Sequence, residues 1–170
     1  MTPDFDTRPG RAGPLNLRDM GAFHVGGQAV QLQGLPSTRE VLAAGGEPVL
    51  LDPNGRYWVG QMYAQYFLPQ APASTTPLQL WHGGGLTGAC WETTPDGRPG
   101  WLHYFVRRGW DTYLCDAAER GRAGYAPQHL WGALLSQTAE AVFARFRLGP
   151  GLGGVALADA ARQAFPEGQF

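Results

Sequence analysis

Residues 78–91 read Leu-Gln-Leu-Trp-His-Gly-Gly-Gly-Leu-Thr-Gly-Ala-Cys-Trp, and this stretch decides the fold. Leu78 to Trp81 predicts a short strand, which runs directly into the glycines after His82, as at a junction between a strand and a helix. Glycines let backbone N–H groups turn toward a ligand because no Cβ is in the way, which is what an oxyanion hole or an anion-binding nest requires. A glycine-rich turn after a strand is also common without any function, so the pattern alone leaves both interpretations open.

A helix and a second strand are predicted after this loop. Trp101 to Arg108 spaces its apolar residues at helical intervals, and Gly109 is placed as the stop of that helix. Residues 110–115 then predict a strand, which ends in an acidic and glycine-bearing loop over residues 116–124. Strand, helix and strand in this order predict a right-handed βαβ unit with parallel strands.

A long helix is predicted downstream of that unit. Gln128 to Leu148 carries an apolar stripe at helical spacing and is terminated by Gly149-Pro150-Gly151. The stripe consists of Leu134, Leu135, Ala139, Val142, Phe143 and Phe146. The remainder, to Phe170, is Gly-rich and then predicts a short Ala-rich helix.

Antiparallel strands are predicted upstream of residue 78. Residues 22–25 and 28–32 alternate around Gly26-Gly27, which is the pattern of a two-residue β-hairpin. A second antiparallel pair is predicted from residues 49–51 and 57–59, on either side of the turn sequence Asp52-Pro53-Asn54-Gly55. Residues 62–68 alternate and would extend this sheet. The predicted fold class is therefore α/β, with antiparallel strands at the start and then a parallel βαβ unit with flanking helices.

Length and composition indicate one principal core. The chain has 170 residues, of which 44% are hydrophobic, as in a globular protein that buries most of its apolar surface. Residues 1–20 carry charge, Pro and Gly without periodicity and are expected to form a flexible arm. Residues 21–170 are expected to hold the folded part.

Charge and cysteine content exclude several function classes. The formal net charge is −1 without a basic block, so nucleic acid is not an expected partner. Cys90 and Cys115 are too few for a disulfide framework and lack metal-ligand spacing, so we expect two buried thiols and no metal or other cofactor. The first 25 residues lack the apolar stretch of a signal peptide, and no apolar run is long enough to span a membrane. These features predict a cytoplasmic protein that does not act at a membrane, unless a leader has been removed.

Two motifs resemble those of a known fold family. His82-Gly83, followed by seven residues and Trp91, is similar to the oxyanion loop of many α/β-hydrolases, and residues 116–124 resemble the Asp-x-x-Gly-x-Gly turn that follows the next parallel strand of that fold. Further segments, spread over residues 21 to 170, resemble the sequences of an atypical bacterial esterase family of this fold. They are Gln61-Met62-Tyr63, Leu86-Thr87-Gly88, residues 91–98, Gly100-Trp101, Tyr104-Phe105, Arg107, Gly109, Thr112-Tyr113, Asp116 and Gly121-Arg122. That family has two adjacent cysteines where this chain has Gly84-Gly85, so no role of a vicinal disulfide carries over.

The resemblance implies roles for the residues of the glycine loop. The Gly84 N–H is the first candidate donor to an oxyanion, and the Gly85 N–H is the second. His82 would brace the loop as a packed, hydrogen-bonded histidine and would not act as a base. Gly83, Leu86 and Trp91 would line the substrate pocket or brace the loop, although Trp91 as a simple core residue is the more common arrangement.

Asp116 stands where α/β sheets place their ligands, at the predicted carboxyl end of a parallel strand. In α/β-hydrolases, however, the acidic member of the catalytic triad follows the nucleophile in the chain. We therefore expect Asp116 to organise its own loop by pairing with Arg120 or Arg122.

The nucleophile of an α/β-hydrolase is missing from this sequence. It stands on a Gly-X-Ser-X-Gly elbow, and none of Ser37, Ser74 and Ser136 has these neighbours. The resemblance thus implies the N-terminal half of a hydrolase domain, with the serine, acid and histidine beyond residue 170. We expect a second polypeptide that carries the elbow and the catalytic histidine, from a split or proteolytically processed enzyme, or else a truncated chain.

Two functions are consistent with the sequence. The first is hydrolysis of a small carboxylic ester by a serine esterase in which this chain supplies the oxyanion loop. The second is a non-catalytic α/β-hydrolase-like module that binds a small molecule or a partner protein, because a fold alone does not fix a function.

Overall fold

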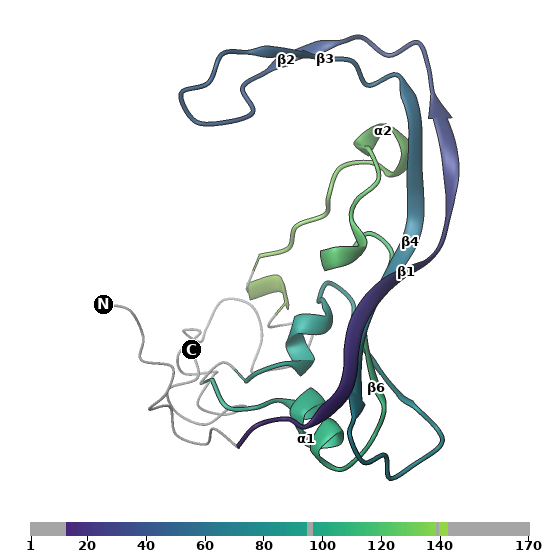
Figure 1. The fold of residues 1–170 in the computed structure, drawn as a ribbon. Helices are drawn as coiled ribbons and strands as arrows, with labels where there is room; N and C mark the ends of the chain where they lie inside the picture. Colours follow the sequence, from purple (N-terminus) through teal and green to yellow (C-terminus); the bar gives the residue numbers. More distant parts are fainter. Residues whose placement is uncertain (1–12, 95–96, 139, 143–170) are drawn as a thin grey trace.

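The computed structural model describes residues 13–94, 97–138 and 140–142 (Figure 1). Its larger sheet has the strand order β1-β4-β6-β5 and is built from β1 (Leu17–Leu32), β4 (Gly55–Pro69), β5 (Leu78–Trp81) and β6 (Thr112–Asp116). A smaller sheet pairs β2 (Thr38–Glu40) with β3 (Val49–Leu51). The labelled helices are α1 (Trp101–Arg107), α2 (Gln128–Trp131) and the two 3₁₀ helices η1 (Gly88–Trp91) and η2 (Gly121–Ala123), and residues 140–142 are also helical. The predicted α/β class, with antiparallel strands at the start and parallel strands after them, is confirmed.

Strands β1 and β4 form one long antiparallel ribbon, with Leu17 opposite Pro69 at one end and Leu32 opposite Gly55 at the other. The predicted hairpin at Gly26-Gly27 is wrong, because both glycines lie inside β1 at φ 74° and 88°. Gly27 leaves room for a neighbouring side chain, because a Cβ on it would overlap the indole of Trp58 on β4. The ribbon also begins before the expected start of the fold at Gly21, and residues 1–12 of the expected arm lie outside the described part.

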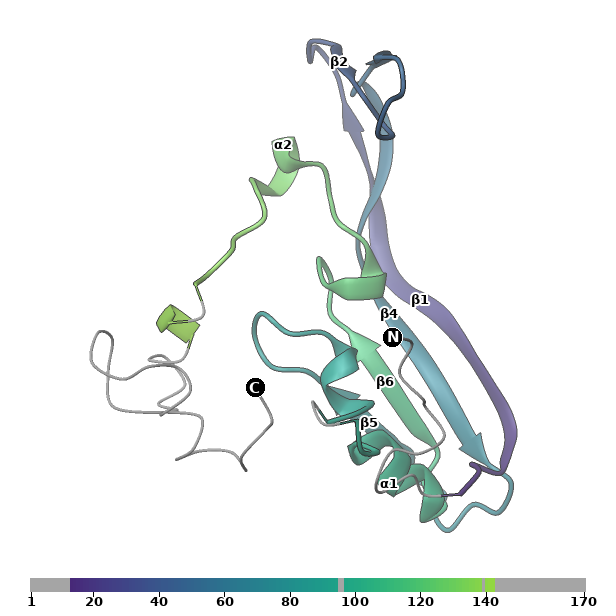
Figure 2. The same ribbon diagram turned by 90° about the vertical axis from the view of Figure 1, so that its left-hand side faces the viewer.

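The small β2–β3 sheet lies at the far end of this ribbon from α1 and β6 (Figures 1 and 2). Here the predicted pairing of residues 49–51 with residues 57–59 is wrong, because β3 pairs with β2 while β4 pairs with β1 and β6. Asn54 explains the difference, since its side chain binds both backbone groups of Leu35, at 2.8 and 2.7 Å. That contact directs the turn toward residue 35. Residues 62–68 form part of β4, as predicted.

The predicted βαβ unit is confirmed. β5 and β6 run parallel, with Leu78 opposite Thr112, and α1 connects them. Gly109, at φ 82°, follows the last turn of α1. Leu80, Leu102, Val106 and Leu114 form the core between α1 and the sheet, and Leu114 is fully buried.

The predicted continuous helix over residues 128–148 is wrong within the described residues. α2 ends at Trp131, and Gly132 follows at φ 81° with its N–H bonded to the Gln128 carbonyl, which is a left-handed helix stop. Leu134 and Leu135 are 63% and 86% exposed, so the apolar stripe has nothing to pack against in this part of the chain. Residues 139 and 143–148, together with the predicted Ala-rich helix near the C-terminus, lie outside the described residues.

Candidate functional site

The glycine loop after β5 forms a tight turn. The Leu86 N–H donates to the Gly83 carbonyl at 3.2 Å, and Gly85 takes φ 79°, as the third residue of a type II turn does. Gly84 is therefore the second residue of the turn, and a Cβ added there would meet nothing within 4 Å. Among the residues that the structure describes, no acceptor bonds the N–H of Gly84 or Gly85. Both predicted donors are thus available to a ligand, on an exposed turn at the carboxyl end of a parallel strand.

His82 is buried at the base of this turn and is 7% exposed. Its Nε2 accepts a hydrogen bond from the Ala117 N–H at 3.0 Å, so the proton is assigned to Nδ1, which donates to the Gly83 carbonyl at 2.8 Å. Because both ring nitrogens are engaged, neither is free to take a proton from a nucleophile. These contacts are those of a bracing histidine, and they connect the turn to the loop after β6.

Asp116, the last residue of β6, is 1% exposed and joins the same two loops. Its Oδ1 accepts from the Gly88 N–H at 2.6 Å, and its Oδ2 accepts from the N–H and the Nε of Arg122, each at 2.8 Å. Burial alone would raise the pKa of this carboxyl, but the hydrogen bonds from Arg122 and Gly88 outweigh burial and hold the pKa below its usual value. Of the two arginines named as possible partners, Arg122 makes the pair, while Arg120 donates to the Glu119 carbonyl.

Residues of β1 and β4 hold the loop after β6 from the other side. The Arg122 guanidinium lies over the Tyr63 ring at 4.5 Å, and the Gln61 amide donates to the Ala123 carbonyl at 2.8 Å. His24 Nε2 lies 3.2 Å from the Arg122 carbonyl. The sequence pattern predicted no role for His24, Gln61 or Tyr63, although Gln61 and Tyr63 belong to a segment that carries the family resemblance.

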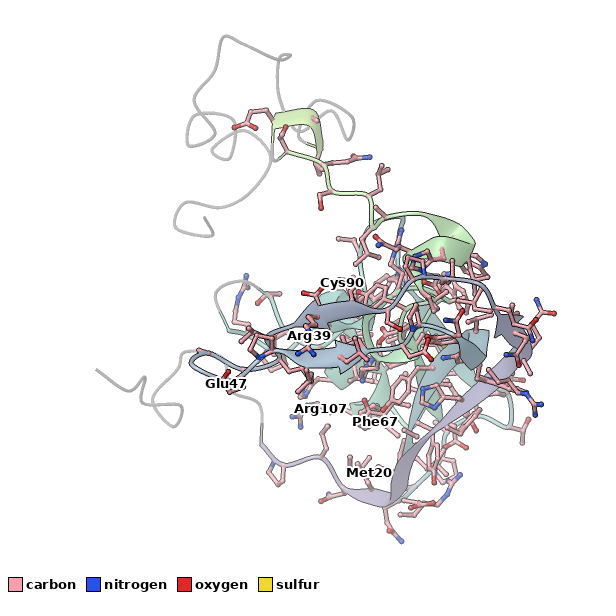
Figure 3. All side chains as sticks on the ribbon, turned by 90° about the horizontal axis from the view of Figure 1, so that it is seen from above. Met20, Arg39, Glu47, Phe67, Cys90 and Arg107 are labelled. Carbon is pink, nitrogen blue, oxygen red and sulfur yellow. The ribbon has the colours of Figure 1, made fainter. Side chains whose placement is uncertain are left out.

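The remaining predicted site residues divide between surface and core. Leu86 is 48% exposed beside the turn. Trp91, at the end of η1, packs against the core cluster, and its buried Nε1 has no partner in the described part of the chain. Both cysteines are free. Cys115 is buried as expected, whereas Cys90 is exposed (Figure 3), so the expectation of two buried thiols is wrong for Cys90.

No group of three or more His, Cys, Asp or Glu side chains that could hold a metal ion occurs within residues 13–94, 97–138 and 140–142. No serine of those ranges sits on a strand-to-helix elbow: Ser37, Ser74 and Ser136 all lie outside helices and strands. Within the described residues, the site is therefore a set of backbone donors without a serine elbow of its own.

A glycine turn of this kind, placed after the first of two parallel strands of a mixed sheet, is the arrangement of α/β-hydrolase-like esterases, and comparison with known proteins leads to the same class. A solved structure of a novel bacterial esterase matches with a TM-score of 0.67 and 35% sequence identity, over 91% of this chain and 50% of the esterase. The probable secreted lipase phiG of a fungal species (strain ATCC 74256) is 41% identical over 73 residues, which are 43% of this chain and 20% of the lipase. No protein-family model matches.

The chain thus resembles α/β-hydrolase-like esterases in both sequence and fold, as the motifs predicted. It spans half of the solved esterase and a fifth of the curated lipase. The expected cytoplasmic location is contradicted, because the curated relative is named a probable secreted lipase. Within the described residues, no helix has the length and apolarity needed to cross a bilayer.

Proposed function

We propose that this chain is the oxyanion-loop half of a serine-type carboxylic ester hydrolase. The observation that carries the proposal is the turn at Gly84 and Gly85, whose N–H groups have no acceptor among the described residues. Such backbone donors are what a tetrahedral intermediate of acyl transfer needs, and fixing them in advance avoids reorganisation during the reaction.

In the proposed reaction, this chain supplies the oxyanion donors, and the complementary half supplies the nucleophile and the base. A serine hydroxyl on the complementary half attacks the ester carbonyl carbon, while a histidine there takes the hydroxyl proton. The carbonyl π electrons move to oxygen, and the resulting oxyanion accepts hydrogen bonds from the N–H of Gly84 and Gly85. Collapse of the intermediate expels the alcohol, which receives the proton from the histidine, and water then hydrolyses the acyl-enzyme by the same steps.

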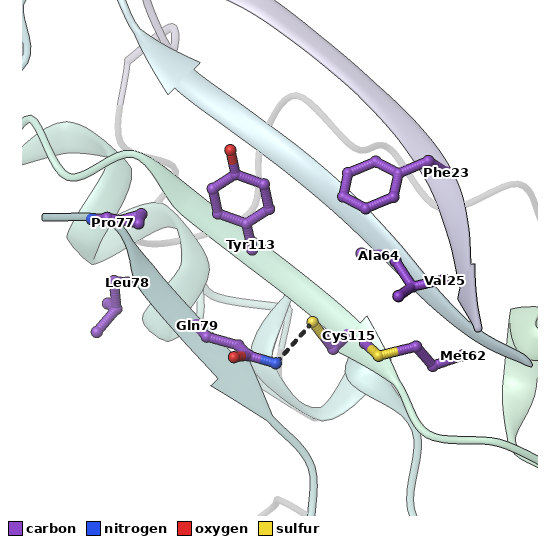
Figure 4. Close-up of a pocket in the computed structure, with 9 residues that line it drawn as sticks. All are labelled: Phe23, Val25, Met62, Ala64, Pro77, Leu78, Gln79, Tyr113 and Cys115. Carbon is purple, nitrogen blue, oxygen red and sulfur yellow. Dashed lines mark hydrogen bonds between the residues drawn. The ribbon is translucent and has the colours of Figure 1, made fainter.

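Exposed apolar surface supports the need for a complementary polypeptide. On the sheet face opposite the Leu114 side chain, a depression of about 370 Å³ is lined largely by apolar side chains (Figure 4). Its lining residues are Phe23, Val25, Met62, Ala64, Pro77, Leu78, Gln79, Tyr113 and Cys115. Within the described residues β5 pairs on one side only, with β6, so its outer edge can accept another strand. Open edges and apolar faces of this kind favour association.

Purification of the tagged chain from its native source, followed by a fluorophosphonate probe and intact mass measurement, tests the proposal. We expect a co-purifying polypeptide, or a longer form of this chain, that carries Gly-X-Ser-X-Gly and takes the label. The proposal would be contradicted if the chain purified alone, with the mass of 170 residues, and neither reacted with the fluorophosphonate nor hydrolysed an aryl ester. That result would support a non-catalytic binding module.

A further inference from the structure

We infer that Asp116 is a positioning residue for ester hydrolysis, because its carboxylate fixes one end of the oxyanion turn through Gly88. This inference rests on the proposed function and adds a coupling between the end of β6 and the donors. Asp116 therefore does more than organise its own loop.

The first argument is the placement of the two anchors of the turn. His82, at its start, binds the N–H of Ala117, and Gly88, at its end, binds the carboxylate of Asp116. Residues 83–86 between the anchors are exposed, so no packing within the described residues holds them. Two adjacent residues at the end of β6 thus set where the donor turn lies.

The second argument is the close fit around the carboxylate. A Cβ on Gly88 would lie 2.8 Å from Asp116 Oδ1 and 2.9 Å from Arg122 Nη2, and a Cβ on Gly121 would lie 2.6 Å from Asp116 Oδ2. Both positions need glycine so that backbone can reach the buried carboxylate. A charge-assisted hydrogen bond of 2.6 Å, largely shielded from water, is strong and directional, which suits a contact that fixes position.

The consequence for catalysis follows from the geometry that an oxyanion hole requires. Its donors must lie about 2.7–3.1 Å from the oxyanion, and a displacement of about 1 Å can cost about 100-fold in rate. Without the carboxylate, the Gly88 N–H would lose its acceptor, and the Gly88 end of the turn would be held less tightly. Substrate binding depends less on the turn than transition-state stabilisation does, so kcat should fall while KM changes little.

The test compares Asp116→Asn with Asp111→Asn in the enzyme assembled with its complementary half. Asp111 lies just before β6, at the end away from the turn, and its ion pair with Arg18 has no contact with the glycine loop. We expect Asp116→Asn to lower kcat for an aryl ester by about 10- to 100-fold, while KM stays within about threefold of wild type. The affinity for an aryl trifluoromethyl ketone, which mimics the tetrahedral intermediate, should fall in proportion to kcat. Asp111→Asn should leave all three values near wild type. An Asp116→Asn enzyme with wild-type kcat and ketone affinity would overturn the inference.

Gly88→Ala is the second variant, in case Asp116→Asn does not fold. It leaves the carboxylate in place and displaces only the Gly88 anchor, so it should lower kcat in the same way. Wild-type kcat in a folded Gly88→Ala enzyme would overturn the inference.

Hydrogen exchange separates this inference from the proposed function, because the measurement needs no enzymatic activity. Exchange of the hydrogen-bonded amides of Leu86 and Gly88 should be at least about 10-fold faster in Asp116→Asn than in Asp111→Asn, and equal exchange overturns the positioning role. A wild-type assembly without esterase activity would overturn the proposed function alone.

Discussion

The Oδ1 atom of Asp116 lies 2.6 Å from the backbone nitrogen of Gly88, so the buried end of β6 is joined directly to the loop after β5. The two residues are 28 positions apart in the chain. This contact and the one between His82 and Ala117 join the loops after β5 and β6 into one unit.

Ionisation of Asp116 should stabilise the fold. Its pKa in the folded chain is below the ordinary value of 3.8, so its contribution is complete above pH 3.8 and is lost as the pH falls through the lower folded value. The free energy of unfolding should therefore decrease from about pH 4 downward more steeply for wild type than for Asp116→Asn. Urea unfolding between pH 7 and 3 measures this difference, and parallel curves would contradict it.

Replacement of His82 by Phe should destabilise the loops by about 1–3 kcal/mol. The ring keeps its approximate size, but the Ala117 N–H loses its acceptor in a part-buried position, and unsatisfied donors carry a cost of that order. His129→Phe, at an exposed position in α2, is the matched control. Equal free energies of unfolding for the two variants would show that the His82 contacts do not hold the loop.

Gly109→Ala should cost more stability than Gly132→Ala. Both glycines have φ near +82°, where any residue with a side chain is strained. A Cβ on Gly109 would also lie 2.8 Å from the backbone nitrogen of Ala73, whereas a Cβ on Gly132 would meet nothing within 4 Å. Thermal or urea unfolding should therefore rank Gly109→Ala as the less stable variant, and the reverse order would contradict the packing of α1 against residue 73.

Leu135→Glu should separate folding of the chain from assembly. The side chain is 86% exposed, so the free energy of unfolding of the chain alone should change by less than about 0.5 kcal/mol. If the complementary polypeptide covers this apolar stripe, the same variant should reduce the yield of the assembled enzyme. A wild-type yield would show that the contact is made elsewhere.

The parts that the sequence predicted correctly are those governed by local pattern. The strand–loop–helix–strand order and the stop of α1 at Gly109 follow from residue spacing and from glycine, which act over a few positions. Gly26-Gly27 has the local signal of a turn, yet both residues lie inside β1, where Gly27 accommodates Trp58 from β4. Within the described residues, the predicted helix over residues 128–148 is interrupted after Trp131, because an amphipathic stripe needs a surface to pack against and Leu134 and Leu135 are exposed.

In the candidate site, the glycine turn and a bracing role for His82 could be predicted, but the bond between Gly88 and Asp116 could not. Asp116 was expected to pair within its own loop, because Arg120 and Arg122 are neighbours in the sequence. Its bond to Gly88 depends on the parallel pairing of β5 with β6, which brings the ends of the two strands together. No local pattern contains that information.

The assignment of Gly84 as an oxyanion donor is tested most directly by comparing Gly84→Pro with Gly84→Ala in the assembled enzyme. Proline is favoured at the second residue of a type II turn, so it should keep the turn while removing the N–H, whereas alanine keeps the N–H and has room for its Cβ. We predict that Gly84→Pro lowers kcat by about 100- to 1000-fold and that Gly84→Ala shows only a small part of that loss. Equal kcat values for the two variants would contradict the assignment.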